Sequence, residues 1–429
     1  MSRPASTSGL WRNAEFRKLW AGRTISAFGS QITVLALPLT AVLTLGASAA
    51  QMGVLLAVQF APVLVLGLVT GVWVDRLPRR PLLIAADLGQ ALLLGAVPLA
   101  AALGLMRIEY LYAVGFLKGG LEVLGQVAAG AYLPAVVGHA GLAEANGRLA
   151  MSRSVAGVVG PGLGGALVQL VTAPVALVAD ALSFVVSAAF LGWVRSAEAA
   201  PPAAGRRGTW AEMGEGLRFV LGHPLLRAQA GAMGLLNFFA GAVTAVDVLF
   251  ITRDLAVPPA VLGTLLAVAS LAAPVGAALA PRIAARFGLG PTMIGALAVF
   301  AAAHLPAPLA AGPPAAVAAI LLAGLALIRL AQPVFEVSSG TLQQAITPNR
   351  LLGRVGATTR LVAVGAVPLG ALLGGAAGEA LGLRPAYTVA AAGKLLAVLW
   401  LALSPLRRLQ AAPSAPSPAT APAAPSTTS

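Results

Sequence analysis

Long apolar runs set the strongest limit on how this sequence can fold. Runs of about 20 apolar residues, enough for a helix to cross a hydrocarbon core of roughly 30 Å, follow one another along most of the chain. The runs are continuous and do not alternate with polar residues, which excludes a membrane-spanning β-barrel. We therefore predict an all-α, polytopic membrane protein with twelve transmembrane helices.

The composition also excludes several classes of function. Apolar residues make up 58% of the chain and charged residues only 10%, whereas soluble domains carry roughly a quarter charged residues. Cysteine is absent, and the three histidines, His139, His223 and His304, lie too far apart in the sequence to suggest a metal site. Because no acidic and histidine side chains cluster, we expect no enzymatic activity, no cofactor and no metal.

Basic residues are concentrated in short connections between the apolar runs. The formal net charge is +14, from 28 Lys and Arg against 14 Asp and Glu. These residues form no basic helix and are not interleaved with aromatic residues, so they indicate membrane topology and not nucleic-acid binding. We expect a multi-pass protein of the cell (inner) membrane with both termini in the cytoplasm. The cytoplasmic basic residues would then include Arg76, Arg79, Arg80, Arg148, Arg195, Arg206, Arg207, Arg282, Arg286, Arg350, Arg354, Arg407 and Arg408.

The apolar runs divide into two groups of six expected helices. The first group lies near 18–45, 51–73, 81–104, 109–136, 147–172 and 174–195, and the second near 227–252, 259–281, 289–309, 314–337, 353–381 and 384–405. We expect an N-terminal six-helix bundle at 18–195, a cytoplasmic linker with a short amphipathic helix at 196–226, and a C-terminal six-helix bundle at 227–408. A cytoplasmic tail, 1–17, precedes them, and a disordered cytoplasmic tail, 409–429, follows; from Ala411 it contains only Ala, Pro, Ser and Thr.

The two halves resemble each other at an offset of about 206 residues. The segment 146–148 matches 352–354, and the glycine-rich segment 160–165 matches 368–375. The offset spans six helices, an even number, so the two copies have the same topology. Parallel repeats of this kind suit a rocking transporter with a site near the middle of the membrane.

The most specific motif lies between the second and third expected helices. It reads Gly71-Val72-Trp73-Val74-Asp75-Arg76-Leu77-Pro78-Arg79-Arg80. Gly71 allows close helix approach, and Asp75 with Arg76, Arg79 and Arg80 supplies charges that can pair across a gate or with a helix end. The motif resembles the loop signature of the major facilitator superfamily.

A glycine-proline motif occupies the fifth expected helix. Its central residues are Gly160, Pro161, Gly164 and Gly165. Small residues let helix backbones approach closely, and proline removes one intrahelical hydrogen bond. The motif resembles one found in exporters of the same superfamily, although ordinary small-residue packing explains it equally well.

Three further segments, 16–20, 142–148 and 180–184, resemble the superfamily branch that contains macrolide efflux proteins and enterobactin exporters. The resemblance covers nearly the whole chain. It implies two pseudo-symmetric six-helix bundles and proton-coupled export of a small amphipathic compound by alternating access. We expect a monomer in the lipid bilayer. The compound would be a lipophilic drug such as a macrolide, or a siderophore. An uptake symporter or lipid transporter of the same fold is the alternative, and a membrane sensor without transport is a more remote one.

Polar residues inside the expected helices are candidates for the functional site, because a charge at a helix centre costs about 2.5 kcal/mol or more unless it is paired or hydrated. Lys118 and Glu122 are four residues apart and share a helix face. Either they face the substrate cavity, or they form an internal salt bridge that only neutralises both charges. The candidates for proton coupling are Glu122, Asp247 and Glu336. The candidates for the substrate cavity are Ser30, Gln31, Gln59, Lys118, Gln126, Asn237, Phe238, Phe239 and Arg329.

A coupling hypothesis follows from Glu122 and Arg329, which hold matching positions in the two halves. If they meet across the pseudo-two-fold axis, protonation of Glu122 would loosen the pair and link proton entry to the change of state. Lys118 and Arg329 would favour an anionic substrate if they are free, and a cationic or neutral one if acids hold them.

The gating motif generates the first prediction. Replacement of Asp75 by Asn should slow turnover more than it weakens substrate binding, because the charge acts on the gate and not on the ligand. Transport rates and equilibrium binding measured on the same preparation check this. An unaltered transport rate would rule out a gating role for Asp75.

Overall fold

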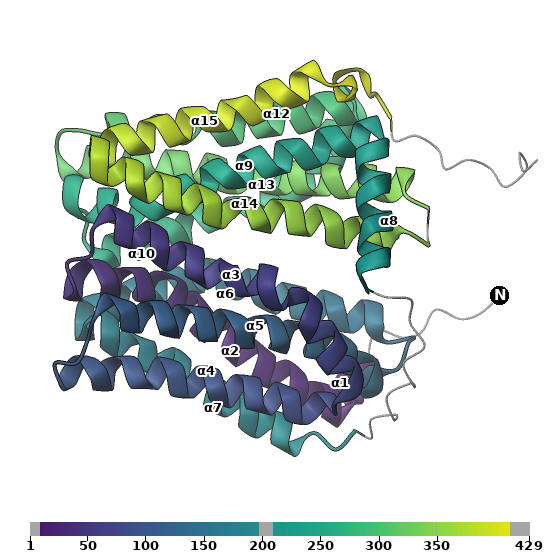
Figure 1. Cartoon of the computed structure of the whole chain (residues 1–429), viewed down its shortest axis with the longest axis horizontal. Helices are drawn as coiled ribbons and strands as arrows, with labels where there is room; N and C mark the ends of the chain where they lie inside the picture. Colours follow the sequence, from purple (N-terminus) through teal and green to yellow (C-terminus); the bar gives the residue numbers. More distant parts are fainter. Residues whose placement is uncertain (1–8, 197–208, 349, 412–429) are drawn as a thin grey trace, which may run out of the picture.

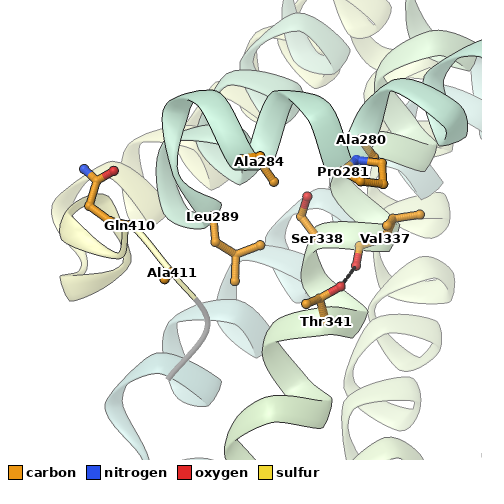
Figure 2. A pocket seen from close by; sticks show the side chains of 10 residues that line it. Ala280, Pro281, Ala284, Leu289, Val337, Ser338, Thr341, Gln410 and Ala411 are labelled. Atoms are coloured by element: carbon orange, nitrogen blue, oxygen red, sulfur yellow. Dashed lines mark hydrogen bonds between the residues drawn. The ribbon is translucent and has the colours of Figure 1, made fainter. Parts of the chain in front are cut away.

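The computed structural model describes residues 9–196, 209–348 and 350–411, apart from the side chains at 67–73, 75 and 209–213. Over these residues the chain forms helices and no strands. Twelve helices are long and apolar enough to cross a membrane, which confirms the prediction from the apolar runs. In Figure 1 they lie roughly parallel in two groups, one from each half of the sequence.

The first half supplies six of these helices. After the short α1 (Gly9–Arg12) they are α2 (Ala14–Leu39), extended by the π-helix η1 (Thr40–Thr44), α3 (Ala49–Arg76), α4 (Arg79–Ala102), α5 (Ile108–Val137), α6 (Leu142–Val171) and α7 (Ala173–Trp193). Within this group α2 packs on α6 and α7, and α5 packs on α3 and α4.

The second half repeats the arrangement. Its elements are α9 (Pro224–Leu249), extended by the π-helix η2 (Phe250–Asp254), α10 (Pro259–Ser270) and α11 (Ala272–Phe287), which together make one span, α12 (Leu289–Ala302) with η3 (Ala307–Leu309), α13 (Pro314–Ile346), α14 (Leu352–Leu381), α15 (Leu383–Leu403) and η4 (Pro405–Arg408). The expected amphipathic helix of the linker is α8 (Thr209–Gly222), while residues 197–208 and 412–429 of the expected linker and tail lie outside the described part.

Four helix boundaries differ from the prediction by four or more residues: the starts of α2 and α6 (Leu142 and not 147) and the ends of α11 (Phe287 and not 281) and α13. α2 begins at Ala14 and not near residue 18, because the Asn13 side chain caps it by accepting hydrogen bonds from the Glu15 and Phe16 amides. α13 continues to Ile346 and not to about 337. Its last turns are polar, but Ser338, Ser339 and Leu342 are buried there against protein and not lipid, so hydropathy marks the end too early.

The repeat is present in the structure, but the offset read from sequence is one helical turn short. α6 and α14, α7 and α15, and the π-helices η1 and η2 each begin 210 residues apart, compared with the predicted 206. A shift of four residues in a helix keeps side chains on nearly the same face, so glycine and arginine patterns match almost as well out of register.

The two ends of the molecule differ in charge. Figure 1 places α8 at one end of the molecule, which also carries the arginine-rich connection at 76–80 and the end of α11. We call this the basic end. The other end, where α2 and α9 finish in their π-helices, we call the opposite end.

The two bundles make their closest contacts at the opposite end. α3 packs on α14, and α6 packs on α10. A Cβ atom on Gly375 of α14 would lie 2.9 Å from the Gly53 Cα of α3, and one on Gly263 of α10 would lie 2.8 Å from the Gly165 Cα of α6. The two contacts are related by the 210-residue repeat, so the same pair of glycine positions brings the bundles together at two places at this end.

An arginine adds a polar contact between the bundles there. Arg253 of η2 donates from Nη2 to the Ala47 carbonyl at 3.0 Å and to the Val42 carbonyl of η1 at 3.5 Å. π-helical turns often occur at functional sites. The opposite end is thus held by backbone contacts at the glycines, by the Arg253 guanidinium, and by the Glu379 carboxylate of α14, which accepts a hydrogen bond from the Ala50 amide of α3.

Replacement of Gly165 by Val should open this end, because a branched side chain cannot fit against the Gly263 backbone. Since the chain has no cysteine, an Ala50→Cys and Glu379→Cys pair can report closure; the Ala50 amide lies 3.4 Å from the Glu379 carboxylate. We expect the yield of a short cross-linker to fall several-fold.

Gly157→Val on the same helix is the matched control, because a Cβ at Gly157 meets nothing within 4 Å. Its cross-linking yield should equal that of the parent. Equal yields for the Gly165 and Gly157 variants would show that the glycine contact does not hold the bundles together.

Candidate functional site

A row of polar side chains follows one face of α5 near its middle. Lys118 donates from Nζ to Glu122 Oε2 at 3.2 Å, and Gln126 donates from Nε2 to Glu122 Oε1 at 3.3 Å. The i,i+4 spacing brings the three side chains together, as the sequence predicted. The Glu122 side chain is 50% exposed and that of Lys118 only 14%, so the ion pair is half open to its surroundings.

The row continues into the other bundle. Arg360 of α14 donates from Nη2 to Gln126 Oε1 at 3.2 Å. The α5 face that carries Glu122 and Gln126 therefore looks toward the second bundle and not toward lipid. We call Lys118, Glu122, Gln126 and Arg360 the inter-bundle row.

α13, the counterpart of α5, also carries a polar face. Gln332 donates from Nε2 to Glu336 Oε1 at 2.8 Å, and Arg329 lies one turn before Gln332. Glu336 is exposed, and Arg329 and Gln332 are half-buried. By the repeat, this face corresponds to that of the inter-bundle row.

The pairing proposed between Glu122 and Arg329 is not made in this structure. Glu122 pairs with Lys118 on its own helix, and within the described part of the chain no acidic oxygen lies within 4 Å of the Arg329 guanidinium. Arg329 interacts electrostatically with Glu336 at longer range.

The other predicted cavity residues are spread over several helices. Gln59 of α3 packs against Gly115 and Gly119 of α5, and Gln31 of α2 packs against Gly160 of α6. Ser30, next to Gln31, is half-buried. These side chains lie inside the first bundle or at its inter-bundle surface.

The α9 candidates are held within the second bundle. Asn237 donates to the Met233 carbonyl of its own helix at 2.9 Å. The Phe239 ring lies against Gly393 of α15, and Phe238 meets Phe239 edge to face at 5.1 Å. The structure brings none of the three into contact with the inter-bundle row.

The glycine-proline motif of α6 has two contact surfaces. Gly160 and Gly164 receive Gln31 and Ile32 of α2, whereas Gly165 meets α10 of the other bundle. Pro161 is buried, and its carbonyl lies against Gly263. The motif therefore packs helices both within a bundle and between bundles.

The gating motif is only partly described. The Gly71 and Asp75 side-chain positions lie outside the described residues, and Arg76 is exposed. Arg80 donates from Nε to the Leu191 carbonyl at 2.9 Å and from Nη2 to the Gly192 carbonyl, both at the end of α7. This part of the motif caps a neighbouring helix, where a cation favours the carbonyl end.

A second group of charges is buried in the outer layer of the C-terminal bundle. Lys394 of α15 is 2% exposed, and its Nζ lies 5.4 Å from the Phe300 ring centroid. It interacts electrostatically with Asp247 of α9 and with His304 beyond α12, although no ion pair within 4 Å joins it to a described residue. Asp247 is therefore separate from the inter-bundle row.

Two buried acids lie in the N-terminal bundle. Asp180 of α7 accepts a hydrogen bond from Thr33 Oγ1 of α2 at 2.5 Å and one from Ser183 Oγ at 2.9 Å. Asp87 of α4, which is 1% exposed, lies 4.0 Å from Arg23 of α2. These contacts join α2 to the outer helices α4 and α7.

Sequence reasoning missed Arg360 and Arg253 as functional candidates. A signal existed for Arg360, because it is an arginine inside an expected transmembrane helix. No signal pointed to Arg253, because it lies beside a helix end, where arginines are common.

Comparison with known proteins identifies the architecture. The transmembrane secretion effector family matches residues 5–426. The multidrug efflux pump Tap of Mycolicibacterium fortuitum is 30% identical over 219 residues, which are 49% of this chain and 53% of Tap, so the chain spans about half the length of this curated relative.

Solved structures share the fold. A nucleoside transporter, NupG (D323A mutant), superposes with a TM-score of 0.76 at 11% identity over 90% of this chain and 98% of its own. A bacterial homologue of the iron transporter ferroportin in an inward-facing state gives 0.73 at 18% identity over 92% and 98%. The twelve helices therefore form the major facilitator fold.

The buried lysine generates a stability prediction. Lys394→Met should destabilise the protein by about 1–3 kcal/mol, because it removes the positive charge that interacts electrostatically with the Asp247 carboxylate. Thermal unfolding in detergent measures the loss, and the double variant Asp247→Asn, Lys394→Met should recover most of it. Lys18→Met, which removes a partly exposed pair with Glu15, should change little. A double variant less stable than Lys394→Met would exclude the pairing.

Proposed function

The chain belongs to the transmembrane secretion effector family and is a transporter of the major facilitator fold, and we propose that it exports a small amphipathic compound in exchange for protons. The compound is a lipophilic drug such as a macrolide, or a siderophore. The observation that carries the proposal is the inter-bundle row, in which ionisable side chains near the middle of α5 are connected to Arg360 of the other bundle.

The conformation of the two bundles, which is closed at one end, also supports transport. We assign the basic end to the cytoplasm, because basic connections face the cytoplasm in multi-pass proteins. The closest contacts between the bundles are then on the outer side, while Glu122 and Gln126 remain exposed between the bundles. This is the arrangement of an inward-facing transporter ready to accept a compound from the cytoplasm.

Alternating access would use the glycine contacts and the Arg253 hydrogen bonds at the outer side. Breaking the glycine contacts and the Arg253 hydrogen bonds would open the outer side, and the bundles would then close on the basic side around the same midplane site. Only groups that bind protons or substrate differently in the two states can drive this change. Glu122 qualifies, because its partner Gln126 accepts a hydrogen bond from Arg360 of the other bundle.

The direction of transport rests on two arguments. The relative Tap is a multidrug efflux pump, and the glycine-proline motif resembles that of exporters. Uptake by a symporter or movement of lipid would use the same fold. Flux measured in starved whole cells and in everted vesicles separates these functions, because its direction distinguishes export from uptake.

Replacement of Glu122 by Gln tests the coupling. The variant keeps the size of the side chain and one of its two acceptor oxygens but cannot bind or release a proton, so it should be expressed normally and lose export driven by a pH gradient. Uptake of a fluorescent drug into everted vesicles, with the gradient imposed and then collapsed, measures the effect.

Glu336→Gln and Asp247→Asn are the companion variants, since both residues are alternative proton carriers. Normal pH-driven transport by the Glu122 variant would remove Glu122 as the carrier. The companion variant that loses transport would then mark the coupling site.

A further inference from the structure

We propose that the exported compound carries an anionic group of the carboxylate type, and that Arg360 and Arg329 select it. The inference rests on the proposed export function, because it concerns the ligand of the inter-bundle row. It depends on which charges near the middle of the membrane are already neutralised and which are not.

Lys118 is neutralised within the first bundle. Its ammonium group pairs with Glu122 at 3.2 Å and also interacts electrostatically with the buried Asp180. Gln126 holds the other oxygen of Glu122. Lys118 is therefore not available to bind a substrate anion, and Glu122 is not available to bind a substrate cation without losing these partners.

Arg360 is in a different situation. One guanidinium nitrogen donates to the neutral Gln126 amide oxygen, and among the described residues no carboxylate lies within 4 Å. The residue is exposed, so its remaining N–H groups are accessible between the bundles. A guanidinium presents five donors in a planar fork that fits a carboxylate with two parallel hydrogen bonds.

Arg329 adds a second such group from α13. It is half-buried and forms no ion pair within 4 Å in the described chain; Glu336, whose Oε1 accepts from Gln332, interacts with it only at longer range. A partly buried guanidinium without a close counter-charge is costly. A bound anion would supply the missing partner.

The charge balance of the facing surfaces points the same way. Lys118, Arg329 and Arg360 provide three positive charges, against two negative charges from Glu122 and Glu336. An anionic ligand restores neutrality, whereas a cationic ligand would add a second unbalanced charge. Electrostatic complementarity of this kind selects between ligands of the same shape.

A matched set of probes tests the inference. Pyrenebutyrate, its primary amide and pyrenebutylamine share one apolar body and differ in the charge of the head group. Binding to the purified full-length protein in nanodiscs is followed by fluorescence. We expect the acid to bind at least tenfold more tightly than the amide, and the amine to bind most weakly.

Variants locate the selectivity. Arg360→Gln should weaken binding of the acid about tenfold and leave the amide unchanged, and Arg329→Gln should do the same. Arg153→Gln, on the counterpart helix α6 and also exposed, is the matched control and should bind all three probes like the parent. Each variant is compared only where its thermal unfolding matches that of the parent.

Several outcomes would overturn the inference: equal affinity for acid and amide, preference for the amine, no binding of any probe, or an Arg360 variant that weakens acid and amide alike. Transport in everted vesicles is measured separately. Selective binding of the acid without pH-driven movement would leave this inference standing and contradict the proposed export function.

Discussion

The hydrocarbon core of the bilayer offers no water to a charged side chain, and most of the arrangement described above follows from that lack. An ionisable group within the helices is therefore stabilised by a partner in the protein, by water or by a bound ligand. Lys118 finds Glu122 on its own helix, Asp180 finds Thr33 on a neighbouring helix, and Asp87 lies beside Arg23. The last two partnerships tie the outer helices α7 and α4 to α2, so these three helices can move as one body.

The same constraint explains why the bundles meet through glycine. Backbones that pack within a membrane gain from close van der Waals contact, since lipid is as apolar as a leucine side chain. At Gly165 and Gly375 two helices approach almost as closely as peptide chains can. Such contacts have no polar groups to dehydrate or rehydrate, which suits surfaces that separate and rejoin during each cycle.

The sequence was sufficient for the fold and for part of the site. Twelve helices follow from length and hydropathy because each helix must span the same thickness, and the Lys118 and Glu122 contact follows from their spacing. The predicted end of α13 was wrong because hydropathy cannot tell polar residues that are buried in protein from polar residues that are exposed to water. Ser338 and Ser339 are polar but buried. Arg360 and Lys394 were missed as partners because their neighbours come from other helices, and only packing decides which faces meet.

The contact made by Arg253 has a consequence for how this outer closure can vary. Its partners are the carbonyl oxygens of Val42 and Ala47, which are main-chain atoms. Any residue at those two positions would present the same acceptors, provided that the π-helical turn is kept. The N-terminal bundle therefore tolerates substitution at these two positions, whereas the C-terminal bundle must keep its arginine. At this contact, mutations of the side chain on one bundle alone can change the strength of the outer closure.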